Sequence, residues 1–182
     1  MGIFKIPDAT IKELDSIQRN FWWGKEKSGG LFLTGWPAIN KHKLNGGMGF
    51  RDLKCFNRAL LEKAAWRLLN SEDKLCAQAL KGRYFPTTSG LHAKKKKNST
   101  WAWQSIQGSM QFIFKCSLLL VGNGQKISIW TDNWIQGEQE PHTPAVELEI
   151  ANTYNKVSDL IDQDTKSWNV TVVQHLFNQQ DA

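Results

Sequence analysis

Hydrophobic residues recur every three or four positions along most of this 182-residue chain, the spacing that places them on one face of an α-helix. The most extended pattern follows Asp52, whose carboxylate is suited to cap the free N–H groups of a helix. The same periodicity predicts further helices near residues 8–21, 72–84, 101–110, 157–161 and 169–177. The apolar stripe of the longest predicted helix consists of Leu53, Phe56, Leu60, Leu61, Ala64 and Leu68.

Polar residues at the starts of three other predicted helices support these assignments. Asp8, Thr100 and Asn169 can each accept hydrogen bonds from free backbone N–H groups. The run Val-Thr-Val-Val at residues 170–173 is also typical of a strand, so a strand remains the alternative there. In the helix near 101–110, the expected buried face is Trp103, Ile106 and Met110.

A glycine-rich stretch, Gly46-Gly47-Met48-Gly49, lies directly before Asp52. Glycine-rich loops can bind phosphates, but such a loop needs a preceding apolar strand and a Gly-Lys-Ser/Thr ending. This stretch has neither. We interpret it as a hinge whose glycines adopt positive φ.

The hydrophobic pattern changes after residue 116. Two apolar segments, residues 117–121 and 126–130, flank Gly122-Asn123-Gly124, and an Asn-Gly pair between apolar segments predicts a β-hairpin. Asp132 follows as a lone carboxylate between tryptophans, and we expect it to organise a turn rather than a metal site. The sequence therefore predicts a mainly α fold with one small β-hairpin.

Composition divides the chain into four regions. Residues 1–92 predict a basic helical region, and residues 93–135 predict a helix plus the β-hairpin. Residues 136–155 are polar, contain two prolines and predict a linker, within which we place a domain boundary. Residues 156–182 predict a short C-terminal helical segment that is truncated.

Charge is distributed unevenly between the two halves. Residues 1–97 hold 19 lysines and arginines against 8 acidic residues, whereas residues 98–182 hold 4 against 9. A basic region of this kind suits a polyanionic partner, and a solvated surface without any partner is the alternative. The candidate nucleic-acid-binding residues are Arg51, Lys54, Arg58, Lys81, Arg83, Lys94, Lys95, Lys96 and Lys97.

The sequence lacks the patterns of metal-binding, cofactor-binding and membrane-spanning proteins. Cys55, Cys76 and Cys116 are far apart, so neither a disulfide framework nor a zinc site is expected. Reduced thiols fit a nuclear or cytoplasmic protein. No apolar run reaches the roughly 20 residues of a membrane helix, which predicts a soluble chain. Because no catalytic constellation is evident, we expect no cofactor and no small-molecule substrate.

An ordered series of motifs resembles a known protein family. The series starts with Phe21-Trp22-Trp23-Gly24, Trp36 and residues 46–67, and it continues with residues 84–85, 101–106, 121–124, 129–134, 157–161 and 168–169. In this order and spacing the motifs resemble plant LINE-type (non-LTR) retrotransposon reverse transcriptases, which are often labelled ribonuclease H proteins. The resemblance extends from about Ile6 to Phe177.

The resemblance implies a region that follows the polymerase palm, corresponds to the thumb and connection, and precedes a zinc-binding segment and a ribonuclease H domain. The family's Tyr-x-Asp-Asp motif, Cys/His-rich segment and acidic ribonuclease H residues are missing here, so no catalytic residue can be transferred. Leu118-Leu119-Leu120 departs from the family, which carries basic residues near this strand. Met1 falls inside the longer family frame, which suggests a truncated or degenerate element copy.

These observations predict a non-catalytic fragment that binds the backbone of RNA or of an RNA–DNA duplex weakly and without sequence preference. The alternative is a structural or protein-interaction module that self-associates through a tryptophan-rich surface, which the palm would otherwise cover. A degenerate expressed fragment without activity is the third interpretation. An independent enzyme is not expected.

Overall fold

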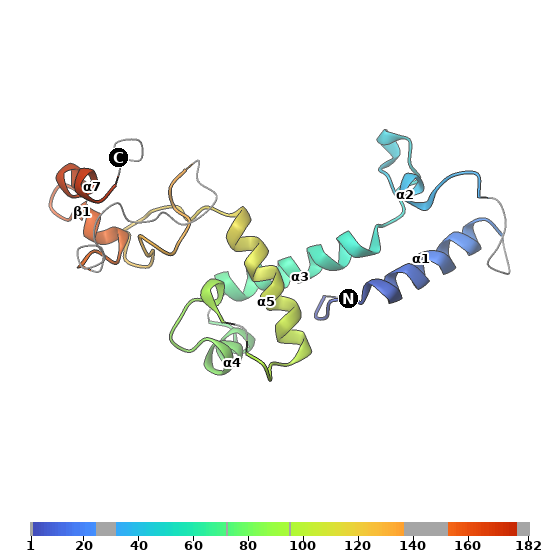
Figure 1. Cartoon of the computed structure of the whole chain (residues 1–182), viewed down its shortest axis with the longest axis horizontal. Helices are drawn as coiled ribbons and strands as arrows, with labels where there is room; N and C mark the ends of the chain where they lie inside the picture. Colours follow the sequence, from blue (N-terminus) through green and yellow to red (C-terminus); the bar gives the residue numbers. More distant parts are fainter. Residues whose placement is uncertain (1, 25–31, 72, 95, 137–152, 178–182) are drawn as a thin grey trace. The chain divides into compact units, whose positions relative to one another are not determined.

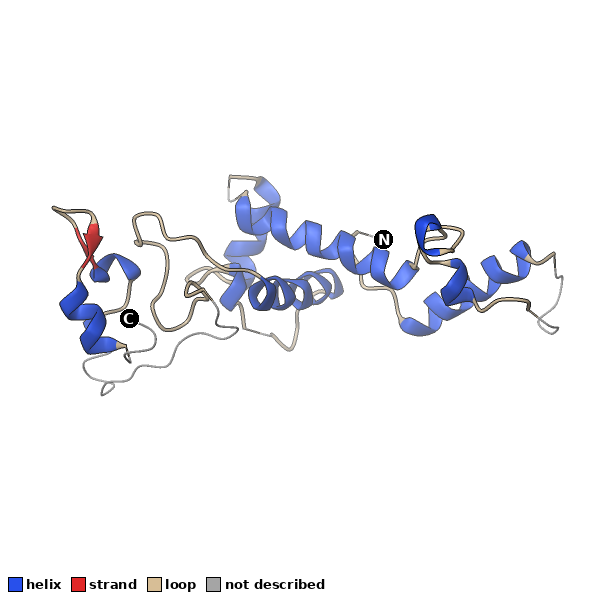
Figure 2. Cartoon of the chain, turned by 90° about the horizontal axis from the view of Figure 1, so that it is seen from above, coloured by secondary structure: helices blue, strands red, loops and turns tan. Residues whose placement is uncertain are grey.

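The computed structural model describes residues 2–24, 32–71, 73–94, 96–136 and 153–177. These residues are mainly helical, with one two-stranded antiparallel sheet (Figure 1; Figure 2). The fold class predicted from the sequence is therefore confirmed. The chain forms two compact units, Met1–Phe112 and Ile113–Ala182.

The N-terminal unit is built from helices. In chain order they are α1 Asp8–Trp22, α2 Trp36–Ile39, the 3-10 helix η1 Lys43–Asn45, α3 Leu53–Asn70, α4 Leu75–Tyr84, the 3-10 helix η2 Gly90–His92 and α5 Trp101–Cys116, whose end belongs to the second unit.

The buried face of α5 agrees with the prediction, although the helix is longer than expected. Trp103, Ile106 and Met110 are all buried. The helix continues to Cys116 because Ile113, which is also buried, extends the same face by another turn. The predicted cap is confirmed by the Trp103 N–H, which donates to Thr100 Oγ1 at 3.4 Å.

The start of α1 differs from the prediction. Pro7 occupies the capping position, and Asp8 is the first residue of the helix rather than its cap. The Asp8 carboxylate instead forms an ion pair with Lys54 on α3, with a nitrogen–oxygen distance of 3.1 Å. The Asp8 carboxylate, which the sequence pattern predicts to accept from backbone N–H groups, is thus paired with a lysine of another helix.

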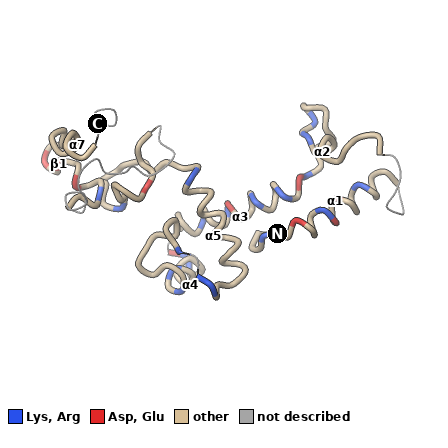
Figure 3. The backbone as a smooth tube through the Cα atoms, in the orientation of Figure 1, with Lys and Arg blue, Asp and Glu red and all other residues tan. Residues whose placement is uncertain are grey.

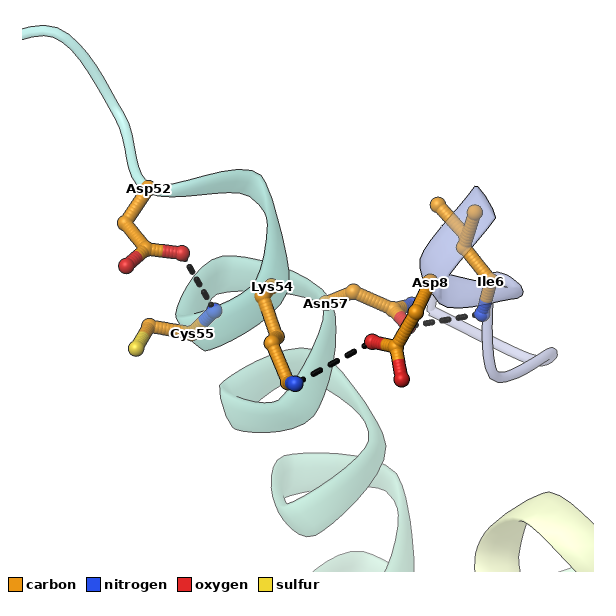
Figure 4. Close-up of polar contacts among 6 residues, drawn as sticks. All are labelled: Ile6, Asp8, Asp52, Lys54, Cys55 and Asn57. Carbon is orange, nitrogen blue, oxygen red and sulfur yellow. Dashed lines mark hydrogen bonds and ion pairs between the residues drawn. The ribbon is translucent and has the colours of Figure 1, made fainter. Parts of the chain in front are cut away.

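The longest helix, α3, has the predicted cap but a different buried stripe. Asp52 Oδ1 accepts a hydrogen bond from the Cys55 N–H at 2.9 Å, which confirms the cap (Figure 4). Its fully buried residues recur at every fourth position: Leu53, Asn57, Leu61 and Ala65. Of the predicted apolar stripe, Phe56, Leu60, Ala64 and Leu68 are only partly buried. The polar Asn57, which is outside that stripe, is buried.

The glycine-rich stretch before α3 forms a tight turn. Gly46 has φ 77° and Gly49 has φ 75°, which confirms the predicted positive φ. Position 47 needs glycine for a different reason, because a Cβ atom there would overlap the Lys41 carbonyl. The Met48 N–H donates to the Ile39 carbonyl at 2.9 Å, which ties the turn to α2.

The C-terminal unit has a small hydrophobic core. Its regular elements are the 3-10 helix η3 Val157–Leu160, the strands β1 Ile161–Asp162 and β2 Ser167–Trp168, and the helix α7 Val170–Leu176. Strand β1 pairs with β2 in antiparallel register, with Ile161 opposite Trp168. The buried core residues are Ile127, Ile129, Val157, Leu160, Leu176 and Phe177.

The hairpin occurs at a different place from the predicted one. Residues 117–121 and 126–130 do not pair with each other; Ile129 N–H donates to the Asn155 carbonyl, and Val157 N–H donates to the Ile127 carbonyl, both at 3.1 Å. Ser128 accordingly forms an isolated bridge with Lys156. The backbone groups of residues 127–129 thus bond residues about thirty positions further along the chain. The two-stranded sheet is formed instead by β1 and β2.

Two further predictions in this unit are confirmed. Asn169 caps α7, since its side chain accepts from the Val172 N–H at 3.2 Å, so residues 170–173 are helical rather than a strand. Asp132 organises a turn, because its buried carboxylate accepts from the Ser128 N–H at 2.8 Å. The predicted linker at 136–155 falls largely in residues 137–152, which lie outside the described residues.

Candidate nucleic-acid interface

The segment before α1 is held between α3 and α5 by side-chain hydrogen bonds. The Asn57 side chain accepts from the Ile6 N–H (Figure 4) and donates to the Phe4 carbonyl, both at 2.9 Å. On the other side, the Lys5 N–H donates to Ser105 Oγ of α5 at 2.9 Å. The backbone at Lys5 is therefore held between these two helices.

Two adjoining hollows meet at this junction. The first has a volume of about 510 Å³ and is lined by residues of the lysine-rich loop and the first turns of α5. The second has a volume of about 370 Å³ and lies between α1, α3 and α5. Both are lined by Lys5, Gln104, Ser105 and Gly108, so the two hollows adjoin along these residues. We call the two hollows together the basic groove.

The first hollow combines three lysines with an exposed aromatic ring. Lys5, Lys96 and Lys97 are exposed, and Lys96 Nζ donates to the Arg83 carbonyl at 2.9 Å. This carbonyl belongs to the last turn of α4, where free carbonyl groups and the helix dipole both favour a cation. Trp101 is 58% exposed at the same end of the groove.

A hydrogen-bond network joins the end of α4 to the start of α5 beside this hollow. The Tyr84 hydroxyl lies 3.0 Å from Thr100 Oγ1 and accepts from the Thr100 N–H at 3.3 Å. These hydrogen bonds lower the pKa of Tyr84 because they stabilise negative charge on its oxygen. The Tyr84 ring stacks on Trp103 with centroids 4.6 Å apart, which fixes the first turn of α5.

The second hollow pairs its cations with carboxylates. Lys54 binds Asp8 at 3.1 Å (Figure 4), and Arg58 binds Glu62 at 2.7 Å. The Arg58 guanidinium also lies 4.0 Å from the centroid of the Phe112 ring. Exposed ion pairs of this kind contribute only about 0–1 kcal/mol, so a phosphate can compete for either cation.

The pairing with Lys54 changes the pKa of the Asp8 carboxyl group. The hydrogen bond from Lys54 and the positive charge of that ammonium group hold the pKa of Asp8 below its ordinary value. More distant charges on Lys5 and Lys12 act in the same direction. The lysines around Asp8 therefore favour its charged form.

The structure brings four of the predicted binding residues onto the basic groove and leaves others elsewhere. Lys54, Arg58, Lys96 and Lys97 line it. Four others line neither hollow, and Lys95 lies outside the described residues. Figure 3 shows the lysines and arginines along α3 and around α4. Those away from the groove are Arg51, Lys81, Arg83 and Lys94.

Two of these outlying arginines lie against aromatic rings that are close to them in sequence. The Arg51 guanidinium lies 4.7 Å from the centroid of the Phe56 ring, and that of Arg83 lies 5.5 Å from the centroid of Tyr84. Such contacts are worth about 0.5–1 kcal/mol at exposed sites. These contacts are sufficient to explain the presence of an arginine at both positions without a nucleic-acid partner.

Sequence reasoning missed three residues of the groove: Lys5, Trp101 and Gln104. Lys5 precedes the first helix by several residues, and its neighbours in the groove come from distant parts of the chain. Trp101 lies outside the apolar stripe of α5 and is exposed. Its position off this stripe could have identified it from the sequence as an exposed aromatic residue. Gln104 lies three residues further on, about one helical turn away.

The described residues hold no other constellation that suggests chemistry. Within them, no group of three or more His, Cys, Asp or Glu side chains could hold a metal ion. The three cysteines are free and exposed. No helix among the described residues has both the length and the apolar character needed to cross a membrane.

The titration of the Cys55 thiol is altered by the cap of α3. A hydrogen bond to the Asp52 carboxylate, together with the negative charge of that group, raises the pKa of the Cys55 thiol. Because the thiolate is the reactive form, Cys55 is a poor nucleophile at neutral pH.

Comparison with known proteins finds two plant relatives. An uncharacterized mitochondrial protein of Arabidopsis thaliana is 32% identical over 140 residues, which cover 76% of this chain and 91% of that protein. A protein of the same plant, named "putative ribonuclease H protein", is 29% identical over 163 residues, which cover 82% of this chain but 24% of that protein. The chain thus spans about a quarter of the longer relative. No family model and no solved structure matches it.

Proposed function

The chain belongs to the plant family of retrotransposon-derived, reverse transcriptase and ribonuclease H-like proteins, and from this premise we propose that it binds the backbone of RNA or of an RNA–DNA duplex through its basic groove. Binding is driven by phosphate contacts, depends on salt and shows little sequence preference. The chain acts as a binding element and carries out no catalytic step itself.

The observation that carries this proposal is the convergence of cations on the basic groove. Lys5 and the consecutive pair Lys96 and Lys97 come from two distant segments of the chain and line the first hollow. Lys54 and Arg58 of α3 line the second. A row of cations along a groove matches the regular spacing of backbone phosphates better than scattered surface lysines do.

Backbone binding also agrees with the polar groups that the groove offers. Its lining is rich in lysine, amide and hydroxyl groups, the donors that most often contact phosphate and sugar oxygens.

Filter binding of an RNA–DNA duplex and of single-stranded RNA over a series of salt concentrations tests this function. The logarithm of the association constant should fall linearly with the logarithm of the salt concentration, with a slope of about −0.7 to −0.9 per phosphate contacted. Binding that is undetectable at low ionic strength, or that does not change with salt, would contradict the proposal.

A second candidate function is self-association, favoured by large apolar side chains at the surface. Phe21 is 85% exposed, Leu75 is 84% exposed and Trp66 is 54% exposed. Exposed apolar side chains can mark a surface that another protein covers when they form one patch. Sedimentation velocity should then show a species larger than the monomer at micromolar concentration, and a monomer at every concentration would exclude this candidate.

A further inference from the structure

The exposed tryptophan of the basic groove has a fixed position. Trp101 is the first residue of α5, and its carbonyl accepts a hydrogen bond from Ser105 Oγ at 2.8 Å. Its ring packs on Phe4, with centroids 5.3 Å apart and an interplanar angle of 36°. Phe4 is held in turn by the Asn57 side chain, which donates to its carbonyl at 2.9 Å.

The two rings of this aromatic pair contact each other and are both exposed to solvent. Trp101 is 58% exposed and Phe4 is 45% exposed. An exposed indole does not contribute the stabilising free energy that its burial would provide. Other tryptophans of this chain are buried, such as Trp103 at 1% exposure. A rigid, solvent-facing indole inside a charged groove is well suited to stacking with a planar ligand.

Cations surround this aromatic platform. Lys5 follows Phe4 directly in sequence, and Lys96 and Lys97 line the same hollow as Trp101. Lys96 is positioned by its hydrogen bond to the Arg83 carbonyl. An exposed aromatic ring beside several lysines is the combination that single-stranded nucleic-acid sites use, with bases stacked on the ring and phosphates bound by the cations.

We propose that Trp101, supported by Phe4, stacks with one unpaired base of a single-stranded nucleic acid, while Lys5, Lys96 and Lys97 bind the neighbouring phosphates. This inference rests on the proposed function and specifies its ligand. A duplex interior does not offer such a base, because each base is already stacked between its neighbours. The groove therefore favours single strands, or single-stranded ends of duplexes, over continuous duplex.

Fluorescence anisotropy with two labelled oligonucleotides of equal length and charge tests this stacking. One is an ordinary single strand, and the other has the same sugar–phosphate backbone without bases. Wild-type protein should bind the ordinary strand about 5- to 150-fold more tightly, as expected for one stacked base. In Trp101→Ala this preference should fall sharply, whereas Trp101→Phe should keep most of it.

Matched controls separate the stacking from general effects. Trp66→Ala removes an exposed tryptophan outside the groove and should keep the wild-type preference. Circular dichroism verifies that each variant keeps its helices. A continuous duplex should bind Trp101→Ala and wild type equally, and an equal loss for duplex and single strand would overturn the inference.

The outcomes distinguish this inference from the function on which it rests. Salt-dependent binding with no preference for bases would leave backbone binding intact and overturn the stacking at Trp101. A preference that Trp101→Ala retains would overturn it as well. If neither oligonucleotide nor the duplex binds at low salt, both the stacking and the proposed function fail.

Discussion

At the scale of single residues, Asp52 has two separable effects on its surroundings. It caps α3 through the Cys55 N–H, and it raises the pKa of the Cys55 thiol. Asp52→Asn should preserve the cap and speed alkylation of Cys55, because asparagine caps as well as aspartate but carries no charge. Asp52→Ala should instead lower the free energy of unfolding by about 0.5–2 kcal/mol.

Mass spectrometry of iodoacetamide-treated protein measures the first effect, with the exposed Cys76 as internal reference. Urea denaturation measures the second. An unchanged alkylation rate at Cys55 in Asp52→Asn would show that the carboxylate does not control this thiol.

The ion pair between Asp8 and Lys54 leads to a prediction about pH. The folded-state pKa of Asp8 lies below its ordinary value of about 3.9, so the pair stabilises the fold above that pH. This stabilisation is lost as the pH falls through the folded-state pKa of Asp8. In Lys54→Gln the pKa of Asp8 should rise toward 3.9, as measured by an NMR titration of its carboxyl carbon. A pKa that does not move would contradict the assigned cause.

Residue-scale predictions from sequence succeeded where the partner is near in the chain. Asp52 and Asn169 each bond an N–H three residues away, so the capping pattern was sufficient to identify them. Asn57 and Lys5 bond partners 51 and 100 residues away. Local sequence patterns cannot identify partners so far apart in the chain. The groove, which depends on these two contacts, could therefore not be predicted from the sequence.

At the scale of elements, Asn57 is the residue that joins the N-terminal segment to α3. It is 3% exposed and bonds both Phe4 and Ile6. Asn57→Ala should lower the free energy of unfolding by about 1–3 kcal/mol, because it leaves two partly buried backbone groups without their partner. It should also weaken nucleic-acid binding, since Lys5 and Phe4 lose their fixed positions.

A matched control is Asn70→Ala, which removes an exposed asparagine that bonds the Trp66 carbonyl within α3. Urea denaturation should show a change below about 0.5 kcal/mol for this variant, as is usual for surface substitutions. Equal losses in the two variants would mean that the Asn57 hydrogen bonds do not anchor the segment.

Helices were predictable at this scale because their hydrogen bonds lie within one segment, whereas strand pairing was not. The apolar segments around Gly124 had good hairpin propensity, yet Ile127 and Ile129 pair with residues 155–157. Gly124 itself approaches the start of η3 so closely that a Cβ would overlap the Ser158 N–H. Its role is to allow this contact, which a turn motif alone does not reveal.

At the scale of the whole molecule, charge follows the two compact units. Residues 98–112 contain no charged residue, so Met1–Phe112 holds the same 19 basic and 8 acidic residues as positions 1–97. Ile113–Ala182 holds the remaining 4 basic and 9 acidic residues. The basic groove thus belongs to the unit with a net positive charge, while the other unit has a net negative charge.

The central claim is that nucleic acid binds in the basic groove rather than to basic surface in general. Two triple variants with the same loss of charge separate these alternatives. Lys5, Lys96 and Lys97 are changed to Gln in the first, and Lys63, Lys74 and Lys126, exposed residues outside the groove, in the second.

The measurement is the salt dependence of binding to single-stranded RNA for wild type and both variants. The groove variant should lose about 0.7 from the magnitude of the slope for each phosphate contact removed, or about 2 in total, while the control variant keeps a nearly wild-type slope. Equal losses in the two variants, or a larger loss in the control, would contradict binding in the groove.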